Sequence, residues 1–202
     1  MMVRTALAAR RFILCGVVLS LLQGARAEAE PAASATAFDH PAALSSYALG
    51  GAGSYESAGV GGRVRWEFLP QRLGVDLYMD AMVVDWPGAF RHDHIIGFSL
   101  YSPFSLSARV RLRPLFGACV NFSFIAPEQS GAPSSNDVLF GLHAGAGLEV
   151  AAIGPLTWFI DAQAIWYVGH ARTAGVWSGA VSGSLASTFS IQPTTGLQVH
   201  FG

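Results

Sequence analysis

Apolar and polar side chains alternate with a period of two along much of the chain, which is the pattern of β-strands whose two faces meet different surroundings. In residues 60–68 one face is apolar, whereas the other carries Arg63, Arg65 and Glu67. Five strands are predicted clearly by this alternation, and three weaker ones complete the set. The eight predicted strands cover residues of about 46–56, 60–68, 73–83, 94–104, 112–124, 140–150, 156–168 and 191–201.

The connections between these strands fall into two kinds. Apart from a short link near 57–59, short turns alternate with longer connections that are rich in Gly, Ser and Pro. The short ones are 69–72, 105–109 and 152–155, and the longer ones are 85–92, 126–137 and about 170–188. Short turns at one rim and longer loops at the other are typical of transmembrane β-barrels.

The two strand faces indicate which solvent surrounds the predicted barrel. The apolar face carries large aromatic residues such as Trp66, Trp158 and Trp166, whereas the polar face combines glycine with balanced charge. Eight strands enclose an interior that side chains alone can fill. We therefore predict an all-β fold, an eight-stranded antiparallel up-and-down transmembrane β-barrel over residues 44–202. The alternative is a soluble barrel of the lipocalin kind, with the apolar face inside.

Composition agrees with an apolar exterior. Of the 202 residues, 12% are charged and 51% are hydrophobic, whereas soluble domains carry about 25% charged residues. All 12 basic residues are arginine, the formal net charge is -1, and no basic run occurs. These features exclude a disordered chain and argue against a nucleic-acid partner.

The N-terminal region has the pattern of a secretory signal peptide. Three arginines precede the apolar run 12–22, and an Ala-Arg-Ala site follows at 25–27. The apolar run is too short to span a bilayer as a helix, which takes about 20 residues. We predict a signal peptide over 1–27 and a flexible periplasmic segment over 28–43.

Two strands and the end of the chain resemble a known family. Residues 113–122 (RPLFGACVNF) and 141–148 (GLHAGAGL) are similar to strands of the small outer-membrane β-barrels of the OmpA transmembrane-domain and OmpX type. Residues 196–201 (GLQVHF) resemble that family's closing strand, although Gly202 follows the terminal aromatic. The resemblance covers roughly residues 44–202.

This resemblance implies where the chain is located and what surrounds it, but it implies no particular activity. It places the chain in the outer membrane of a Gram-negative-type bacterium, to which the signal peptide would export it. Its partners would be outer-membrane lipid and lipopolysaccharide, with the barrel-assembly machinery acting during insertion. The surface partner is not identified by the sequence, and no cofactor is expected.

The charged residues of the inward face are the main candidates for a functional site. If the turn at 69–72 is tight, Arg65 lies opposite Asp76 on neighbouring strands. Buried charges must be paired, and near-balance predicts a lumen closed by ion pairs rather than a single-sign pore. The predicted network consists of Arg63, Arg65, Arg111 and Arg113 with Glu67, Asp76, Asp80, Glu149 and Asp161.

Three functions follow from this interpretation. The leading one is a non-enzymatic envelope protein with a structural or surface-interaction role. The first alternative is a small pore for small solutes, and the second is a lipid A-modifying enzyme. His92, Asp93 and Ser99 come nearest to a catalytic set of the palmitoyltransferase type, but without a defined motif, and we predict no catalytic residues.

Two other candidate sites have simpler interpretations. His92 and His94 lie on one side of a predicted strand and could bind zinc or copper, but no third ligand is visible, so we expect a polar rim and no metal. Cys119 falls on the inward face between Gly117 and Asn121. Because no basic partner is identifiable for it, we expect this cysteine to serve packing.

Overall fold

The computed structural model describes residues 37–53, 55–86, 89–127, 134–170 and 185–202. The predicted signal peptide lies outside these residues. The described part contains one 3-10 helix and nine strands, and no helix in it is long and apolar enough to cross a membrane. The elements are η1 (Ala37–Asp39), β1 (Ala42–Gly53), β2 (Ser57–Leu69), β3 (Leu73–Trp86), β4 (Ala89–Tyr101), β5 (Phe104–Ser107), β6 (Val110–Pro127), β7 (Ser135–Ile153), β8 (Leu156–His170) and β9 (Leu185–Phe201).

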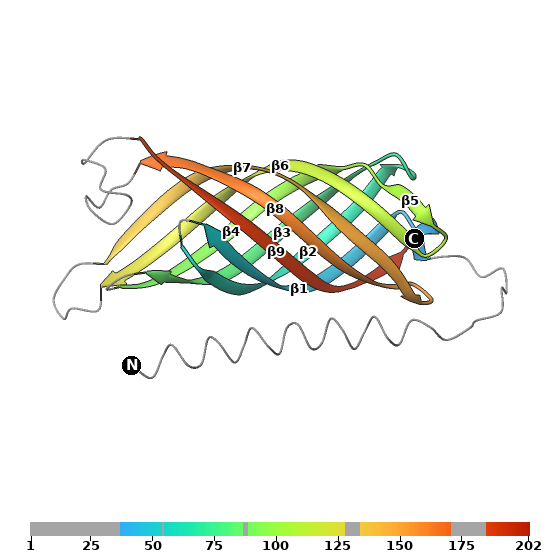
Figure 1. Ribbon diagram of the computed structural model, residues 1–202, viewed down its shortest axis with the longest axis horizontal. Helices are drawn as coiled ribbons and strands as arrows, with labels where there is room; N and C mark the ends of the chain where they lie inside the picture. Colours follow the sequence, from blue (N-terminus) through green and yellow to red (C-terminus); the bar gives the residue numbers. More distant parts are fainter. Residues whose placement is uncertain (1–36, 54, 87–88, 128–133, 171–184) are drawn as a thin grey trace. The chain divides into compact units, whose positions relative to one another are not determined.

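The strands form a single closed antiparallel sheet (Figure 1). Their order is β4-β3-β2-β1-β9-β8-β7-β6-β5, and a further pairing of β4 with β6 closes the ring. The short β5 follows β4 after Ser102 and Pro103 and pairs with the beginning of β6. A proline has no backbone N–H to donate to the ladder, so the break falls at this point. Since β4 and β5 together form one wall segment, the predicted eight-stranded antiparallel barrel is confirmed.

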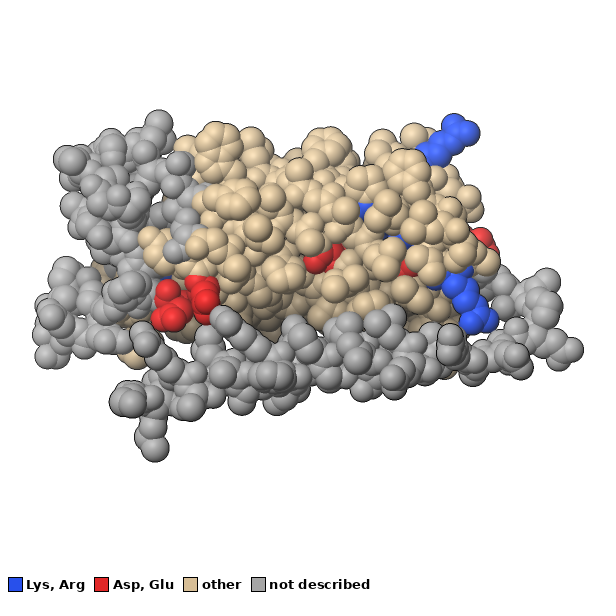
Figure 2. Space-filling model, viewed as in Figure 1, with Lys and Arg blue, Asp and Glu red and all other residues tan. Residues whose placement is uncertain are grey.

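Side chains alternate between the lumen and the outside as the sequence predicts. On β3 the residue Asp76 is 1% exposed, whereas its neighbour Leu77 is 58% exposed. On β2, Arg65 is 2% exposed and Trp66 is 58% exposed. In the face drawn in Figure 2, uncharged side chains cover most of the described wall, and most charged atoms lie toward the two ends. The barrel therefore has a polar interior and an apolar exterior.

Several strands are longer than their apolar alternation predicts. β7 begins at Ser135 rather than at 140, and β9 begins at Leu185 rather than at 191. At the loop side, Ser135 pairs with Ile125 of β6. A strand ladder needs only backbone hydrogen bonds, so pairing continues where alternation has faded. Residues 185–188, which the sequence predicts to belong to the connection of about 170–188, are the first residues of β9, and residues 171–184 lie outside the described part.

The N-terminal cap, residues 37–41, covers the turn-side end of the lumen. Phe38 is 5% exposed, and its carbonyl oxygen accepts a hydrogen bond of 2.8 Å from Arg111. The Arg111 guanidinium also lies 4.2 Å from the centre of the Phe38 ring. The backbone N–H of Glu67 donates to the Pro41 carbonyl at 2.7 Å. Thus residues 37–43 hold defined structure against the barrel, where the sequence predicts a flexible segment over 28–43.

Candidate functional site

Six inward-facing charged side chains form what we call the central ion-pair cluster. They come from β2, β3, β6, β7 and β8, and each side chain is at most 3% exposed. Three are arginines and three are carboxylates, so the cluster is formally neutral. Its members are Arg63, Arg65, Arg113, Asp76, Glu149 and Asp161.

Asp76 is the carboxylate that contacts all three arginines. Its nearest partner is Arg65, the residue opposite it in the β2–β3 ladder, with Nε–Oδ1 at 2.7 Å and Nη2–Oδ2 at 3.1 Å. The Nη1 atoms of Arg63 and Arg113 lie 3.3 and 3.4 Å from Oδ2. The predicted facing pair of Arg65 and Asp76 is thereby confirmed. Two parallel contacts between one guanidinium and one carboxylate fix the orientation of both groups.

Three of the remaining ion pairs connect strands that are not neighbours in the sheet. Asp161 of β8 lies 2.7 Å from Arg63 and 2.8 Å from Arg113. Glu149 of β7 pairs with Arg65 of β2, and it also lies 3.0 Å from Arg113 on the neighbouring strand β6. In the sheet order, β1 and β9 separate β2 from β8. Apart from Arg113–Glu149, these contacts therefore connect wall segments that do not pair through their backbones.

Aromatic rings and glycines complete the packing around the cluster. The guanidinium carbons of Arg65 and Arg113 lie 4.7 and 5.3 Å from the centre of the Tyr101 ring, a distance at which a cation is attracted by the ring face. A side chain at Gly147 would place its Cβ 1.9 Å from Asp161 Oδ1. The glycine therefore makes room for the carboxylate, and the lumen is filled at this level.

The other three predicted network residues lie at different levels of the lumen. Arg111 and Glu67 form a separate ion pair of 2.9 Å beneath the N-terminal cap. Asp80 lies apart from the cluster and accepts a hydrogen bond of 2.6 Å from the Tyr47 hydroxyl. The inward orientation that the sequence predicts for all three is observed, since each is at most 6% exposed.

A second charged group lies near the loop side, and the sequence analysis does not predict it. Arg91 donates from Nε and from Nη2 to the two carboxylate oxygens of Asp93, each at 2.7 Å. Asn121 donates to the same carboxylate at 2.8 Å. Arg91 lies within the predicted connection 85–92, although its alternation with Asp93 is the signal that would have placed both inside.

The structure separates the residues considered for catalysis or metal binding. His92 and His94 point outward, and His94 packs its ring against Phe124 at 5.6 Å. Asp93 points into the lumen, so it does not meet either histidine. Ser99 is also inside, where its hydroxyl lies 2.8 Å from Nε2 of His143. Among the described residues, no group of three or more His, Cys, Asp or Glu side chains is placed to hold a metal ion.

Comparison with known proteins shows which class of fold the chain has. Neisserial surface protein A is 14% identical, with a TM-score of 0.54 over 79% of this chain and 96% of its own. A major outer membrane protein from Thermus thermophilus is 14% identical, with a TM-score of 0.54 over 80% of this chain and 100% of its own. The fold is that of the small outer-membrane β-barrels. The outer membrane enzyme PagL is also similar, at 16% identity and a TM-score of 0.41 over 75% of this chain and 97% of its own. No protein-family model matches the chain, and no curated protein matches its sequence.

Proposed function

We propose that the chain is a non-enzymatic outer-membrane β-barrel protein with a structural or surface-interaction role and a lumen closed by ion pairs. The central ion-pair cluster carries this proposal. Its six side chains are at most 3% exposed, and its ion pairs reach across the lumen. An interior filled by paired charged side chains holds the strands of the barrel wall together rather than conducting solutes.

The outward face supports a membrane location. Large apolar side chains such as Met79, Phe116 and Leu142 are each at least 56% exposed. In water an apolar surface of this extent would drive association, whereas hydrocarbon is its favourable surrounding. We propose that the chain is exported by the signal peptide predicted over 1–27 and inserted by the barrel-assembly machinery. Outer-membrane lipid and lipopolysaccharide would then surround the wall.

The closed lumen favours the structural role over the small pore. A selective pore presents rings of one charge sign to a hydrated path. Here Asp76, Glu149 and Asp161 are each engaged by at least two arginines. Opening a path would separate buried partners, and removing one partner of a buried pair costs about 3–5 kcal/mol.

The positions of the candidate nucleophile and bases favour a non-enzymatic role. Ser99 and His143 are 2% and 4% exposed inside the lumen, where a lipid substrate in the membrane would not reach them. The second ring nitrogen of His143 lies 3.4 Å from the Tyr78 hydroxyl. A lipid-modifying site needs a nucleophile and a base that are accessible from the bilayer or the loop-side rim.

Planar-bilayer recording tests the closed lumen. We expect the purified protein to give no steady, discrete openings after insertion. A variant that combines Arg63→Ala, Arg113→Ala and Asp161→Ala, and that still migrates as a folded barrel on an unheated detergent gel, should pass small ions. Steady openings of the unmodified protein would contradict the proposal and support the pore.

Two further measurements test the location and the absence of lipid chemistry. Heat-dependent mobility on a detergent gel, with tryptophan quenching by brominated lipid, is expected for a membrane barrel. Mass analysis of lipid A should show the same species in cells with and without the protein. A new acylation or deacylation product would establish an enzyme instead.

A further inference from the structure

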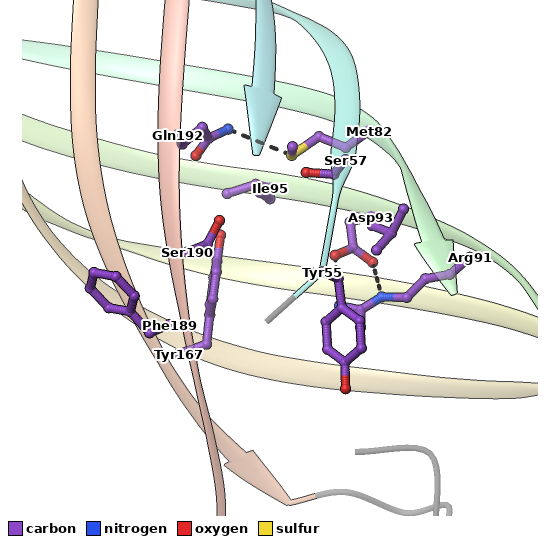
Figure 3. Close-up of a pocket in the computed structure, with 11 residues that line it drawn as sticks. Tyr55, Ser57, Met82, Arg91, Asp93, Ile95, Tyr167, Phe189, Ser190 and Gln192 are labelled. Carbon is purple, nitrogen blue, oxygen red and sulfur yellow. Dashed lines mark hydrogen bonds and ion pairs between the residues drawn. The ribbon is translucent and has the colours of Figure 1, made fainter. Parts of the chain in front are cut away.

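A pocket toward the loop-side end of the lumen is lined in part by the Arg91–Asp93 pair. Its cavity volume is about 50 Å³. In Figure 3, Arg91 and Asp93 lie at the right, Gln192 and Met82 at the top, and the rings of Tyr55 and Tyr167 lower in the view. The pocket thus adds further side chains to the Arg91–Asp93 group described above.

The polar groups of the pocket are arranged for a neutral ligand. Arg91 and Asp93 are the charged residues among those that line it, and they neutralise each other through two contacts of 2.7 Å. An entering anion or cation would have to break this pair before finding a counter-charge. The pocket is also lined by Ser57 and Ser190, whose hydroxyl groups both donate and accept hydrogen bonds, as the hydroxyl groups of a ligand do.

Gln192 adds an amide at the inner end of the pocket. Its side chain hydrogen-bonds to Asp80, and its Nε2 also donates to the thioether sulfur of Met82 at 3.5 Å, which is a weak acceptor. A ligand hydroxyl would be a better acceptor than the thioether. Gln192 is only 4% exposed and projects from β9 at a fixed register opposite Gln163. Its donor is therefore held in place before any ligand arrives.

Aromatic side chains supply the apolar part of the pocket. Tyr167 is 7% exposed. Together with Tyr55, its ring lines the same cavity as the polar groups. Such a combination of ring faces and mixed donors and acceptors suits a molecule with apolar C–H faces and many hydroxyl groups. Sugars have this chemistry.

We propose that this pocket binds a terminal residue of an uncharged glycan. The proposal rests on the surface-interaction role proposed above, and it names the class of partner. A volume of about 50 Å³ holds several water molecules, which corresponds to the hydroxyl-bearing edge of one sugar ring rather than to an oligosaccharide. The pocket lies at the rim opposite the short turns, the rim that carries the extracellular loops in outer-membrane β-barrels.

Binding of neutral monosaccharides by the purified protein tests this inference. The protein is kept in a zwitterionic detergent, because glycoside detergents would compete for the pocket. Saturation-transfer NMR and calorimetry are run with methyl hexosides and N-acetylhexosamines. We expect saturable binding of at least one neutral sugar, with saturation strongest at protons on one edge of the ring.

Two leucine variants localise the binding. Gln192→Leu should weaken it about tenfold, which corresponds to the loss of one hydrogen bond. Gln163→Leu is the matched control, because Gln163 faces the lumen on the neighbouring strand but does not line the pocket, and it should leave binding unchanged. Heat-dependent gel mobility shows that both variants are folded.

Three outcomes would overturn the inference. They are no saturable binding by the folded protein, equal weakening by the two leucine variants, and salt-sensitive binding of acidic or sulfated sugars alone. The proposed function fails separately, through steady openings in the bilayer recording. Absence of sugar binding by a closed barrel would therefore refute the glycan site while leaving the proposed function standing.

Discussion

Replacing Asp76 by asparagine is the sharpest test of the central ion-pair cluster. The substitution keeps the size of the side chain and removes one negative charge. Three arginines would then share Glu149 and Asp161, and the cluster would carry an unbalanced positive charge. Arginine does not lose its proton in proteins, so the imbalance cannot be relieved by titration of the guanidinium groups.

The contacts of Asp76 set the expected magnitude. Its carboxylate accepts two hydrogen bonds from Arg65, at 2.7 and 3.1 Å, and lies 3.3 and 3.4 Å from Arg63 and Arg113. Its side chain is only 2% exposed, so water replaces little of what is lost. Breaking a buried pair by removing one partner costs about 3–5 kcal/mol. We expect the free energy of unfolding to fall by this amount.

Urea unfolding in lipid vesicles, followed by tryptophan fluorescence, measures the effect. Asp85→Asn is the matched control, because Asp85 lies on the same strand but is exposed. We expect this control to change the unfolding free energy by less than about 0.5 kcal/mol. Combining Asp76→Asn with Arg63→Gln restores neutrality, so the double variant should be more stable than the two separate losses predict.

The reasoning is refuted if Asp76→Asn lowers the unfolding free energy by less than about 1 kcal/mol, which is the range of an exposed ion pair. A double variant whose loss equals the sum of the single losses would also contradict the cluster. That result would mean that Arg63 and Asp76 do not neutralise each other in the folded protein.

Three further predictions concern the cap, the packing of the wall and the lipid face. Arg111→Ala removes the hydrogen bond and the ring contact that hold the N-terminal cap. The amide hydrogens of the cap should then exchange at least about tenfold faster, and unchanged exchange would argue against the contact. Gly117→Ala places a methyl group 1.9 Å from a carbonyl oxygen of β4 and should lower the free energy of unfolding in urea by about 1–3 kcal/mol. The control is Gly62→Ala on the outward face, where the nearest atom is 3.8 Å away and little effect is expected. Leu142→Arg, near the middle of β7, should destabilise the barrel in vesicles by about 2–4 kcal/mol, and Ile153→Arg at the turn-side rim by at most about 1 kcal/mol; equal costs would contradict a bilayer around the wall.

The sequence predicts the faces of the barrel well because one physical constraint sets them. Consecutive strand side chains point to opposite sides, so a polar residue at one position fixes the orientation of its neighbours. The predicted inward positions of Arg63, Asp76 and Glu149 follow from this alternation alone. The facing pair of Arg65 and Asp76 across β2 and β3 follows from one tight turn, since a turn sets the register of the whole ladder at once.

Contacts that depend on the closed ring could not be predicted in the same way. Which arginine meets Asp161 depends on the stagger of strands that are distant in the sequence. Asp80 is predicted to join the ion-pair network because it is acidic and faces inward, whereas its observed partner, Tyr47, is an uncharged residue on β1. The cap escaped prediction because η1 has no alternating pattern, and its buried phenylalanine is held by an arginine 73 positions away.

The ion pairs across the lumen also impose an order on assembly. Arg65 and its partner Glu149 are separated by 84 residues, so the arginines of β2 stay without these counter-charges until β7 and β8 have been added. Asp76 of β3 is the first counter-charge that both arginines of β2 meet. Glu149 and Asp161 complete the pairing only when β7 and β8 arrive, so full neutralisation of these arginines and closure of the ring are coupled.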